Sequence, residues 1–265
     1  MVPSAVRTRY IAFDAVSFAY REKQTAVLTD FTLELKRREF FLLLGPSGCG
    51  KTTALNMLAG FEHPLEGHVS VDGQPITGPG PDRVVVFQGD DSLLGWLSTA
   101  ENVEFGLLLA GVSRAERKQR AGQVLETVGL AGHGAKHPAE LSGGMKQRVQ
   151  IARALVSNAD ILLMDEPFAA VDAQTRTILQ DELARIWTET RRTVLFITHD
   201  IAEAIILGDR IGIMRAGPDS NIKEIVTNDL PRPRSRGDAS FATMYARIER
   251  AVSEEVMSAM RKESR

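Results

Sequence analysis

The chain has 265 residues, 43% of them hydrophobic and 25% charged, with a formal net charge of −2. These values are ordinary for a globular protein, and the length suits one compact unit with subdomains. The charge balance supplies no basic field, so we expect no nucleic-acid partner. Cys49 is the single cysteine, which excludes an intramolecular disulfide and fits a reducing compartment.

No segment of the sequence is typical of a membrane-spanning helix. The longest apolar runs, such as Phe40–Leu44 and Ile161–Met164, are far shorter than the roughly 20 residues that cross a bilayer. The first residues contain no apolar stretch, so we expect no signal peptide. If the protein serves a membrane process, we expect the membrane-spanning part to be another chain.

The first third of the chain reads as strands around a glycine-rich loop. Strands are expected over residues 10–18, 27–35, 40–44 and 68–72. Phe40–Leu44 is all apolar, which is typical of a strand buried on both faces, and it leads directly into the loop. A helix is expected over Thr52–Ala59, ended by Gly60.

The remainder changes from helices to a strand–helix alternation. Val84–Phe87 is expected to be a buried strand ending at Gln88. Residues 92–158 are expected to be helical, with capping boxes at Ser98 and Ser113 and a helix end at Gly129. Strands are then expected over 161–164 and 193–198, and helices over 174–188 and from about Asp200. Such alternation predicts a mostly parallel sheet with helices on both faces.

The C-terminal segment, residues 231–265, reads as a linker and a helix. The linker is Pro231-Arg232-Pro233-Arg234. Apolar residues then recur at helical spacing, which predicts an amphipathic helix; they are Phe241, Tyr245, Ile248, Val252 and Val256. This helix either packs on its own domain or contacts a partner.

The glycine-rich loop fits the pattern G-x-x-x-x-G-K-[ST], which cradles nucleotide phosphates with its backbone N–H groups. The candidate nucleotide-binding residues here are Gly45, Pro46, Ser47, Gly48, Cys49, Gly50, Lys51, Thr52 and Thr53. Lys51 supplies a positive charge to the β- and γ-phosphates, and the Thr52 hydroxyl is a candidate Mg²⁺ ligand. We expect Cys49 to make the site sensitive to bulky thiol reagents.

Three further positions at strand ends carry candidate catalytic groups. Asp165 is a candidate Mg²⁺ anchor and Glu166 a candidate general base for the attacking water, on opposite sides of one strand. The alternative is that this pair only caps the next helix. Gln88 offers its amide oxygen to Mg²⁺ or to the water.

His199 also follows an apolar strand, at the end where open α/β sheets bind ligands, so we interpret it as a γ-phosphate sensor. Tyr20, upstream of the loop, is a candidate for stacking on adenine, and the alternative is an ordinary core or surface tyrosine.

Together with the segment Leu141–Arg148, these residues resemble the ATP-binding cassette (ABC) ATPases over about residues 10–215. The resemblance assigns an A-loop at Tyr20, a Walker A loop at 45–52, a Q-loop at Gln88, a signature at 141–148, Walker B at 161–166, a D-loop at Asp172 and a switch histidine at His199. It implies an α/β fold, a RecA-like P-loop NTPase core with an antiparallel β-subdomain and an α-helical subdomain near 92–158. The ATPase domain would span residues 8–230.

The resemblance also implies partners and cofactors. ATP and Mg²⁺ would be bound, and Ser142, Gly143 and Gly144 would meet the ATP of a second copy in a homodimer. Two permease subunits and, indirectly, a solute-binding protein would complete a transporter, with this chain peripheral on the cytoplasmic face of the plasma membrane. The segment 88–102, with the apolar residues Leu93, Leu94, Trp96 and Leu97, would grip the permease, or alternatively pack under the helical subdomain.

A finer resemblance is to the nitrate/sulfonate/taurine importers, carried by the segments 93–98, 168–176 and 230–234. The alternatives are a split exporter or an importer of another solute. A DNA-repair or translation cassette, a small-molecule kinase or GTPase, and a nucleotide-gated module without catalysis fit the motifs less well.

Overall fold

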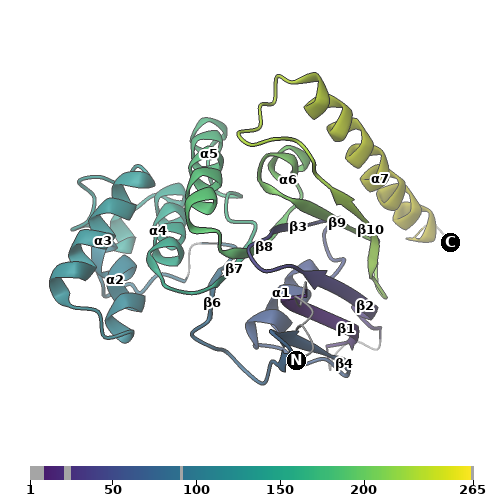
Figure 1. Ribbon diagram of the computed structural model, residues 1–265, viewed down its shortest axis with the longest axis horizontal. Helices are drawn as coiled ribbons and strands as arrows, with labels where there is room; N and C mark the ends of the chain where they lie inside the picture. The colour runs from purple at the N-terminus through teal and green to yellow at the C-terminus, as the bar shows by residue number, and fades with distance from the viewer. Residues whose placement is uncertain (1–8, 21–24, 90–91, 264–265) are drawn as a thin grey trace, which may run out of the picture. The chain divides into compact units, whose positions relative to one another are not determined.

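The computed structural model describes residues 9–20, 25–89 and 92–263, which form two compact units. The first unit comprises the described residues up to Gly80 and those from Thr190 onward, and the second is Pro81–Glu189. Figure 1 shows the elements along the chain. The overall class is α/β, as predicted.

An antiparallel sheet in the first unit has the strand order β2-β1-β4-β5. Its strands are β1 (Ile11–Phe18), β2 (Leu28–Leu35), β4 (Glu66–Val71) and β5 (Gln74–Pro75). β1 lies between its two partners, with Ile11 opposite Leu35 on one side and Val71 on the other. Leu28, Phe31, Leu33 and Leu35 of β2 are buried and alternate with exposed residues from Phe31 onward, so one face of this strand covers the core. The three expected strands are confirmed, and β5 is an addition.

The first unit also contains a run of strands in the order β10-β9-β3-β8. These are β3 (Phe40–Leu44), β8 (Thr193–Thr198), β9 (Arg210–Met214) and β10 (Ile222–Thr227). β3 runs parallel to β8 and β9, and β10 is antiparallel to β9. Every residue of β3 and β8 is buried, as the apolar sequence of β3 and the apolar centre of β8 predict. β9 and β10 were not expected from the sequence.

The register of β3 and β8 determines which segments follow the two strands at the edge of the sheet. Leu44, the last residue of β3, lies opposite Thr198, the last residue of β8. The glycine-rich loop and His199 therefore leave neighbouring strands at the same carboxyl-terminal edge. This is the edge at which open α/β sheets bind ligands.

Three helices belong to the first unit. α1 (Lys51–Ala59) packs on β4 and β8, and α6 (Ile201–Leu207) packs on β3 and β8. α7 (Ala239–Glu263) lies along α6 (Figure 1) and buries Phe241, Ile248 and Ala251. Of the two alternatives for this terminal helix, packing on its own domain is therefore observed. Among the described residues, no helix has the length and apolar character that crossing a membrane requires.

The second unit combines two parallel strands with helices. β6 (Arg83–Val86) pairs with β7 (Ile161–Asp165), and the helices are α2 (Thr99–Leu109), α3 (Arg114–Thr127), α4 (Gly143–Val156) and α5 (Ala173–Thr190). A short 3-10 helix covers Pro138–Glu140. α2, α3 and α4 pack on one another as the expected helical group (Figure 1).

Two local predictions in the second unit need correction. β6 ends at Val86 rather than Phe87, and Phe87 is 40% exposed. Among the described strands β6 pairs only with β7, so one of its edges is unpaired and its residues are only half-buried up to Val85. The capping box at Ser98 is confirmed, but at Ser113 only the bond from the Glu116 N–H is formed, while the Glu116 carboxylate lies 3.6 Å from Arg120.

Candidate functional site

The backbone of the glycine-rich loop requires glycine at two positions. Gly48 and Gly50 have φ values of 78° and 91°, in the left-handed region that other residues rarely adopt. A Cβ on Gly50 would lie 2.6 Å from Cδ2 of Leu28, whereas a Cβ on Gly48 would meet nothing within 4 Å. The loop therefore turns tightly between β3 and α1, as a phosphate-binding nest must.

The N-terminus of α1 is left open to an anion. Its N-cap residue, Gly50, makes no side-chain capping bond, and the first turn contains no acidic residue. By contrast, side chains cap five other described helices: Ser98 caps α2, Ser113 caps α3, Ser142 caps α4, Asp172 caps α5 and Asp200 caps α6. The positive end of the α1 dipole is thus available at the loop, where phosphate would be stabilised.

Lys51 brings its charge back into the loop. Its side chain is 7% exposed, and Nζ donates hydrogen bonds to the carbonyl oxygens of Gly45 (2.8 Å) and Pro46 (2.7 Å). A cation held inside a nest of backbone groups is suited to a phosphate oxyanion.

Tyr20 is hydrogen-bonded to the first turn of α1. Its hydroxyl lies 3.2 Å from Oγ1 of Thr53, and its ring meets Phe18 edge-on at 4.9 Å. The side chain is 37% exposed, so part of the ring remains open for stacking. The expected contact with adenine stays a prediction.

The environment of Cys49 argues against the expected sensitivity of the site to bulky thiol reagents. Cys49 is fully buried, with Sγ 3.9 Å from Sδ of Met214. Burial raises the pKa of this thiol, although the nearby Lys51 opposes the shift. Because the thiolate is the reactive form, both access and ionisation are reduced.

His199 is placed by the segment around it. Oγ1 of Thr198 accepts a hydrogen bond from the N–H of Asp200 (3.0 Å) and donates one to Oε2 of Glu203 (2.6 Å). Asp200 in turn caps α6 through the N–H groups of Ala202 and Glu203. The exposed His199 therefore sits on a backbone fixed on both sides.

Two carboxylates in the second unit differ in environment. Asp165 ends β7 and is 5% exposed, whereas Glu166 lies just beyond the strand with φ of 45°. The backbone turn, and not the strand pleat that we expected, therefore separates them. α5 is capped by Asp172, whose carboxylate accepts from the N–H of Thr175 (3.0 Å), so this pair is not the cap of the next helix.

Gln88 lies beside Glu166. Its Nε2 donates to Oε2 of Glu166 at 3.3 Å, which directs the amide nitrogen to the carboxylate and leaves the amide oxygen for another partner. That oxygen is the atom predicted from the sequence to bind Mg²⁺ or to contact the attacking water. The structure thus brings together two candidate residues that are 78 positions apart.

The signature segment opens α4. The Met145 N–H donates to Oγ of Ser142 at 3.3 Å, and Gly143 and Gly144 form the first turn. A Cβ on Gly143 would meet nothing within 4 Å, and one on Gly144 would lie 3.4 Å from the carbonyl oxygen of Ala170. Two residues beyond Ala170, the hydrogen bond from the Thr175 N–H lowers the pKa of Asp172, so this carboxyl group is ionised at neutral pH.

Two side chains that were not predicted from the sequence connect α4 to the segment after Gln88. Gln150 donates to the carbonyl oxygen of Gly89 (2.6 Å), and Arg153 donates to the carbonyl oxygen (2.9 Å) and Oγ (3.1 Å) of Ser92. Burial lowers the pKa of Arg153. Their signal was visible as two long polar residues, three apart, in the otherwise apolar stretch 149–156.

The segment 92–98 is shaped by Asn102. This buried side chain accepts from the N–H of Leu94 and donates to the carbonyl oxygens of Leu94, Leu97 and Ser98. Trp96 is consequently held 75% exposed, whereas Leu93, Leu94 and Leu97 are half-buried. Of the apolar group expected to be exposed, only Trp96 is fully so.

Comparison with known proteins agrees with these motifs. Residues 28–169 match the ABC transporter family. The chain is 44% identical to the nitrate import ATP-binding protein NrtD of Synechococcus elongatus, over 92% of this chain and 90% of the relative. It is 49% identical to the taurine import ATP-binding protein TauB of Chromobacterium violaceum, over 80% of this chain and 81% of the relative.

A solved structure shows the same fold. It is a dimeric ATP-binding cassette in a post-hydrolysis state, bound to ADP and phosphate. It superposes with a TM-score of 0.74 at 31% sequence identity, over 85% of this chain and 99% of that one. The RecA-like core with antiparallel and helical subdomains, predicted from the sequence, is thereby confirmed.

Proposed function

Since the chain belongs to the ABC transporter family and carries its ATP-binding domain, we propose that it is the ATP-hydrolysing subunit that energises import of a small anion or organosulfur compound. The observation that carries this proposal is the similarity to nitrate and taurine import proteins along four fifths or more of the chain. The membrane passage would be formed by a separate permease.

The loop between β3 and α1 binds the ATP phosphates in this proposal. Its backbone N–H groups and the uncapped end of α1 face the phosphates, and Lys51 contacts the β- and γ-phosphates. Tyr20 covers the adenine. The two fixed left-handed glycines support the assignment, because they let the backbone approach the phosphates closely.

Magnesium fits the donor chemistry of three residues. Thr52, Gln88 and Asp165 offer a hydroxyl, an amide oxygen and a carboxylate, the hard oxygen ligands that Mg²⁺ prefers. When bound, Mg²⁺ would neutralise charge on the phosphates.

Hydrolysis requires a general base for the attacking water and a group that contacts the γ-phosphate. Glu166 accepts the proton of the attacking water as it attacks the γ-phosphorus, and Gln88 orients the Glu166 carboxylate. His199 contacts the γ-phosphate from the edge of the sheet. ADP leaves as the bond to the γ-phosphorus breaks.

A second copy of the chain completes the site. The N-terminal end of α4 is formed by Ser142, Gly143 and Gly144, and it is a second helix end that could bind an anion. Because the chain already has one phosphate-binding loop, this second end is explained if it contacts the ATP held by another copy. We therefore propose an isologous dimer with two ATP molecules between the copies. The similarity to a solved dimeric cassette supports this arrangement.

The same proposal puts the chain on the cytoplasmic face of the plasma membrane, bound to two permease subunits. The exposed Trp96 is the proposed contact with the permease. The solute would be selected by the permease and a separate solute-binding protein.

The hydrolysis step is tested with Glu166→Gln in the purified full chain. We expect ATP hydrolysis to fall by about three orders of magnitude, because the amide accepts no proton, while ATP binding persists and a dimer accumulates with ATP. Undiminished hydrolysis would reject Glu166 as the base.

Growth of a deletion strain tests import. Taurine or alkanesulfonates serve as sole sulfur source and nitrate as sole nitrogen source, with sulfate and ammonium as controls. Loss of growth on one compound, rescued by the wild type but not by Glu166→Gln, would support import and identify the solute class. Normal growth on all of them would favour another imported solute or a split exporter.

A further inference from the structure

The short helix α6 connects His199 to the segment Leu230–Arg234. α6 has seven residues and is therefore about 10 Å long. A helix this short is marginal by itself and depends on what holds its ends. Its N-terminal end is bonded to the two residues that flank His199: Glu203 accepts from the Thr198 hydroxyl, and the Asp200 carboxylate accepts from the Ala202 N–H.

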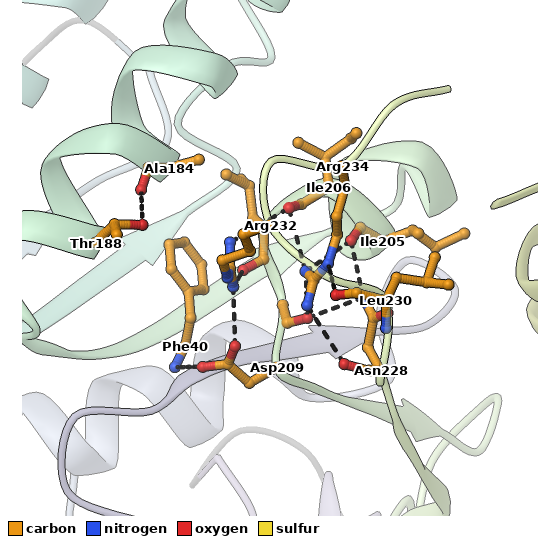
Figure 2. Close-up of polar contacts among 12 residues, drawn as sticks. Phe40, Ala184, Thr188, Ile205, Ile206, Asp209, Asn228, Leu230, Arg232 and Arg234 are labelled. Atoms are coloured by element: carbon orange, nitrogen blue, oxygen red, sulfur yellow. Dashed lines mark hydrogen bonds and ion pairs between the residues drawn. The ribbon is translucent and has the colours of Figure 1, made fainter. Parts of the chain in front are cut away.

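Two arginines hold its other end, and we call Arg232 and Arg234 the arginine clamp. Arg234 Nη1 donates to the carbonyl oxygens of Ile205 (2.9 Å), Ile206 (3.2 Å) and Gly208 (2.7 Å), as Figure 2 shows. Arg232 donates to the carbonyl oxygen of Leu207. The clamp thus bonds the last carbonyls of α6, which have no partner within the helix, and it shares those of Ile205 and Gly208 with Nδ2 of Asn228.

The electrostatics of the clamp favour a fixed geometry. Burial lowers the pKa of Arg234 to about 10, and the neighbouring Arg232 contributes, yet the group remains a cation at neutral pH. Two cations at the negative end of a helix dipole stabilise that helix. Because the planar guanidinium of Arg234 also donates to the carbonyl oxygens of Leu230 and Asn228, its position is defined by bonds on both sides.

The clamp also reaches the strand that leads to the glycine-rich loop. Oδ1 of Asp209 accepts from Arg232 at 3.0 Å, and Oδ2 accepts from the N–H of Phe40, the first residue of β3, also at 3.0 Å (Figure 2). β3 ends at the loop, and α6 begins beside His199. One cluster therefore anchors the far ends of both elements that carry the candidate phosphate-binding groups of this unit.

We propose that Arg232 and Arg234 are positioning residues for ATP hydrolysis, which hold α6 so that His199 stays in register with the glycine-rich loop. This inference rests on the proposed role of His199 in hydrolysis. In this proposal the two arginines act on the C-terminal end of α6 and not on the nucleotide, so we expect the clamp to affect the rate of the chemical step and to leave ATP binding by the loop intact.

The first test compares Arg234→Met with Arg234→Lys in the full chain. We expect Arg234→Met to lower kcat by about tenfold while the KM for ATP changes by less than about twofold. Arg234→Lys should restore part of kcat, since a lysine keeps the charge but cannot bond several carbonyls in one plane. Arg247→Met is the matched control, because Arg247 lies exposed on α7, 4.0 Å from Glu224, and we expect no change in kcat.

A double-mutant cycle with His199→Ala distinguishes positioning from general stability. If the clamp acts through His199, Arg234→Met should lower kcat by less than about twofold in the His199→Ala background. An equal fold-loss in both backgrounds would overturn the inference, as would a change confined to the melting temperature. If Arg234→Met does not fold, Arg234→Lys carries the same cycle.

The cycle also separates the two proposals. A His199→Ala chain with wild-type kcat would reject the proposed role of His199 and the clamp inference with it. A strongly impaired His199→Ala chain with additive effects of Arg234→Met would reject the clamp alone.

Discussion

Gly48 and Gly50 form a matched pair for testing how the loop is built. Both have positive φ, so alanine at either position suffers the same kind of backbone strain, of about 1–2 kcal/mol. Only at Gly50 would the new Cβ also approach another side chain, 2.6 Å from Cδ2 of Leu28. Leu28 is fully buried in β2 and has little room to move.

The structure predicts the size of the difference. Carbon atoms in contact prefer separations of about 3.5–4.0 Å, so the contact at Gly50 is about 1 Å too short. Overpacking of this kind costs about 1–3 kcal/mol. We therefore expect Gly48→Ala to destabilise the chain by about 1–2 kcal/mol, and Gly50→Ala by about 2–5 kcal/mol.

Urea denaturation of the two variants, followed by far-UV circular dichroism, measures the difference as a shift in midpoint at unchanged slope. Leu28→Ala provides an internal check, since it removes the closest contact and leaves Cγ1 of Val27, at 3.1 Å from the new Cβ. The double variant with Gly50→Ala should be more stable than the sum of the single effects by about 1 kcal/mol or more. Equal midpoints for Gly48→Ala and Gly50→Ala would refute this reasoning.

Three further predictions concern side chains outside that pair. Cys49 should react with a bulky disulfide reagent at neutral pH much more slowly in the folded chain than in urea. Because burial raises the pKa of Cys49, the rate in the folded chain should increase only when the pH exceeds the ordinary pKa of a thiol. Rapid labelling of the native chain at neutral pH would contradict the burial of Cys49. Ser98→Ala should destabilise the chain by about 1 kcal/mol through loss of the α2 cap, measurable by thermal melting, and an unchanged melting temperature would count against the cap. Trp96→Glu should leave the melting temperature and basal ATP hydrolysis unchanged but lower solute uptake in vesicles containing the permease; wild-type uptake would reject Trp96 as the permease contact.

Local patterns predicted the elements whose residues share one environment. Phe40–Leu44 is apolar throughout and Thr193–Thr198 is apolar from Val194 to Ile197, and both proved to be strands buried on both faces. Gly60 was expected to end α1, and its φ of 83° places a Cβ 2.2 Å from the carbonyl carbon of Gly78, a position that only glycine tolerates. The local pattern was sufficient to predict these elements, whereas the close approach of Gly78 to Gly60 is visible only in the structure.

Other elements depend on partners distant in sequence. β10 carries Lys223 and Glu224, which make it look polar, yet Lys223 is paired with Glu254 and Glu255 of α7. The neighbouring β9 was overlooked in the same region. No local pattern indicates that a charged residue of a strand will be paired with carboxylates of a helix some thirty residues later.

The candidate site divides in the same way. Motif spacing was sufficient to select the glycine-rich loop, Asp165, Glu166 and His199, but it gave no geometry. The hydrogen bond between Gln88 and Glu166, and the left-handed backbone at Glu166, arise from tertiary packing. The burial of Cys49 was likewise invisible in a loop that reads as exposed.

α4 has a mechanical consequence for the second unit. The helix has 14 residues, begins at the signature glycines, and grips the segment after Gln88 through Gln150 and Arg153, roughly 10–15 Å further along its axis. A hydrogen-bonded helix of this length behaves as a rigid rod, so a tilt imposed at one end must displace the other. A force applied to Gly143 by a neighbouring molecule would consequently move the backbone at Gly89 and Ser92, and a force on that backbone would be returned to Gly143.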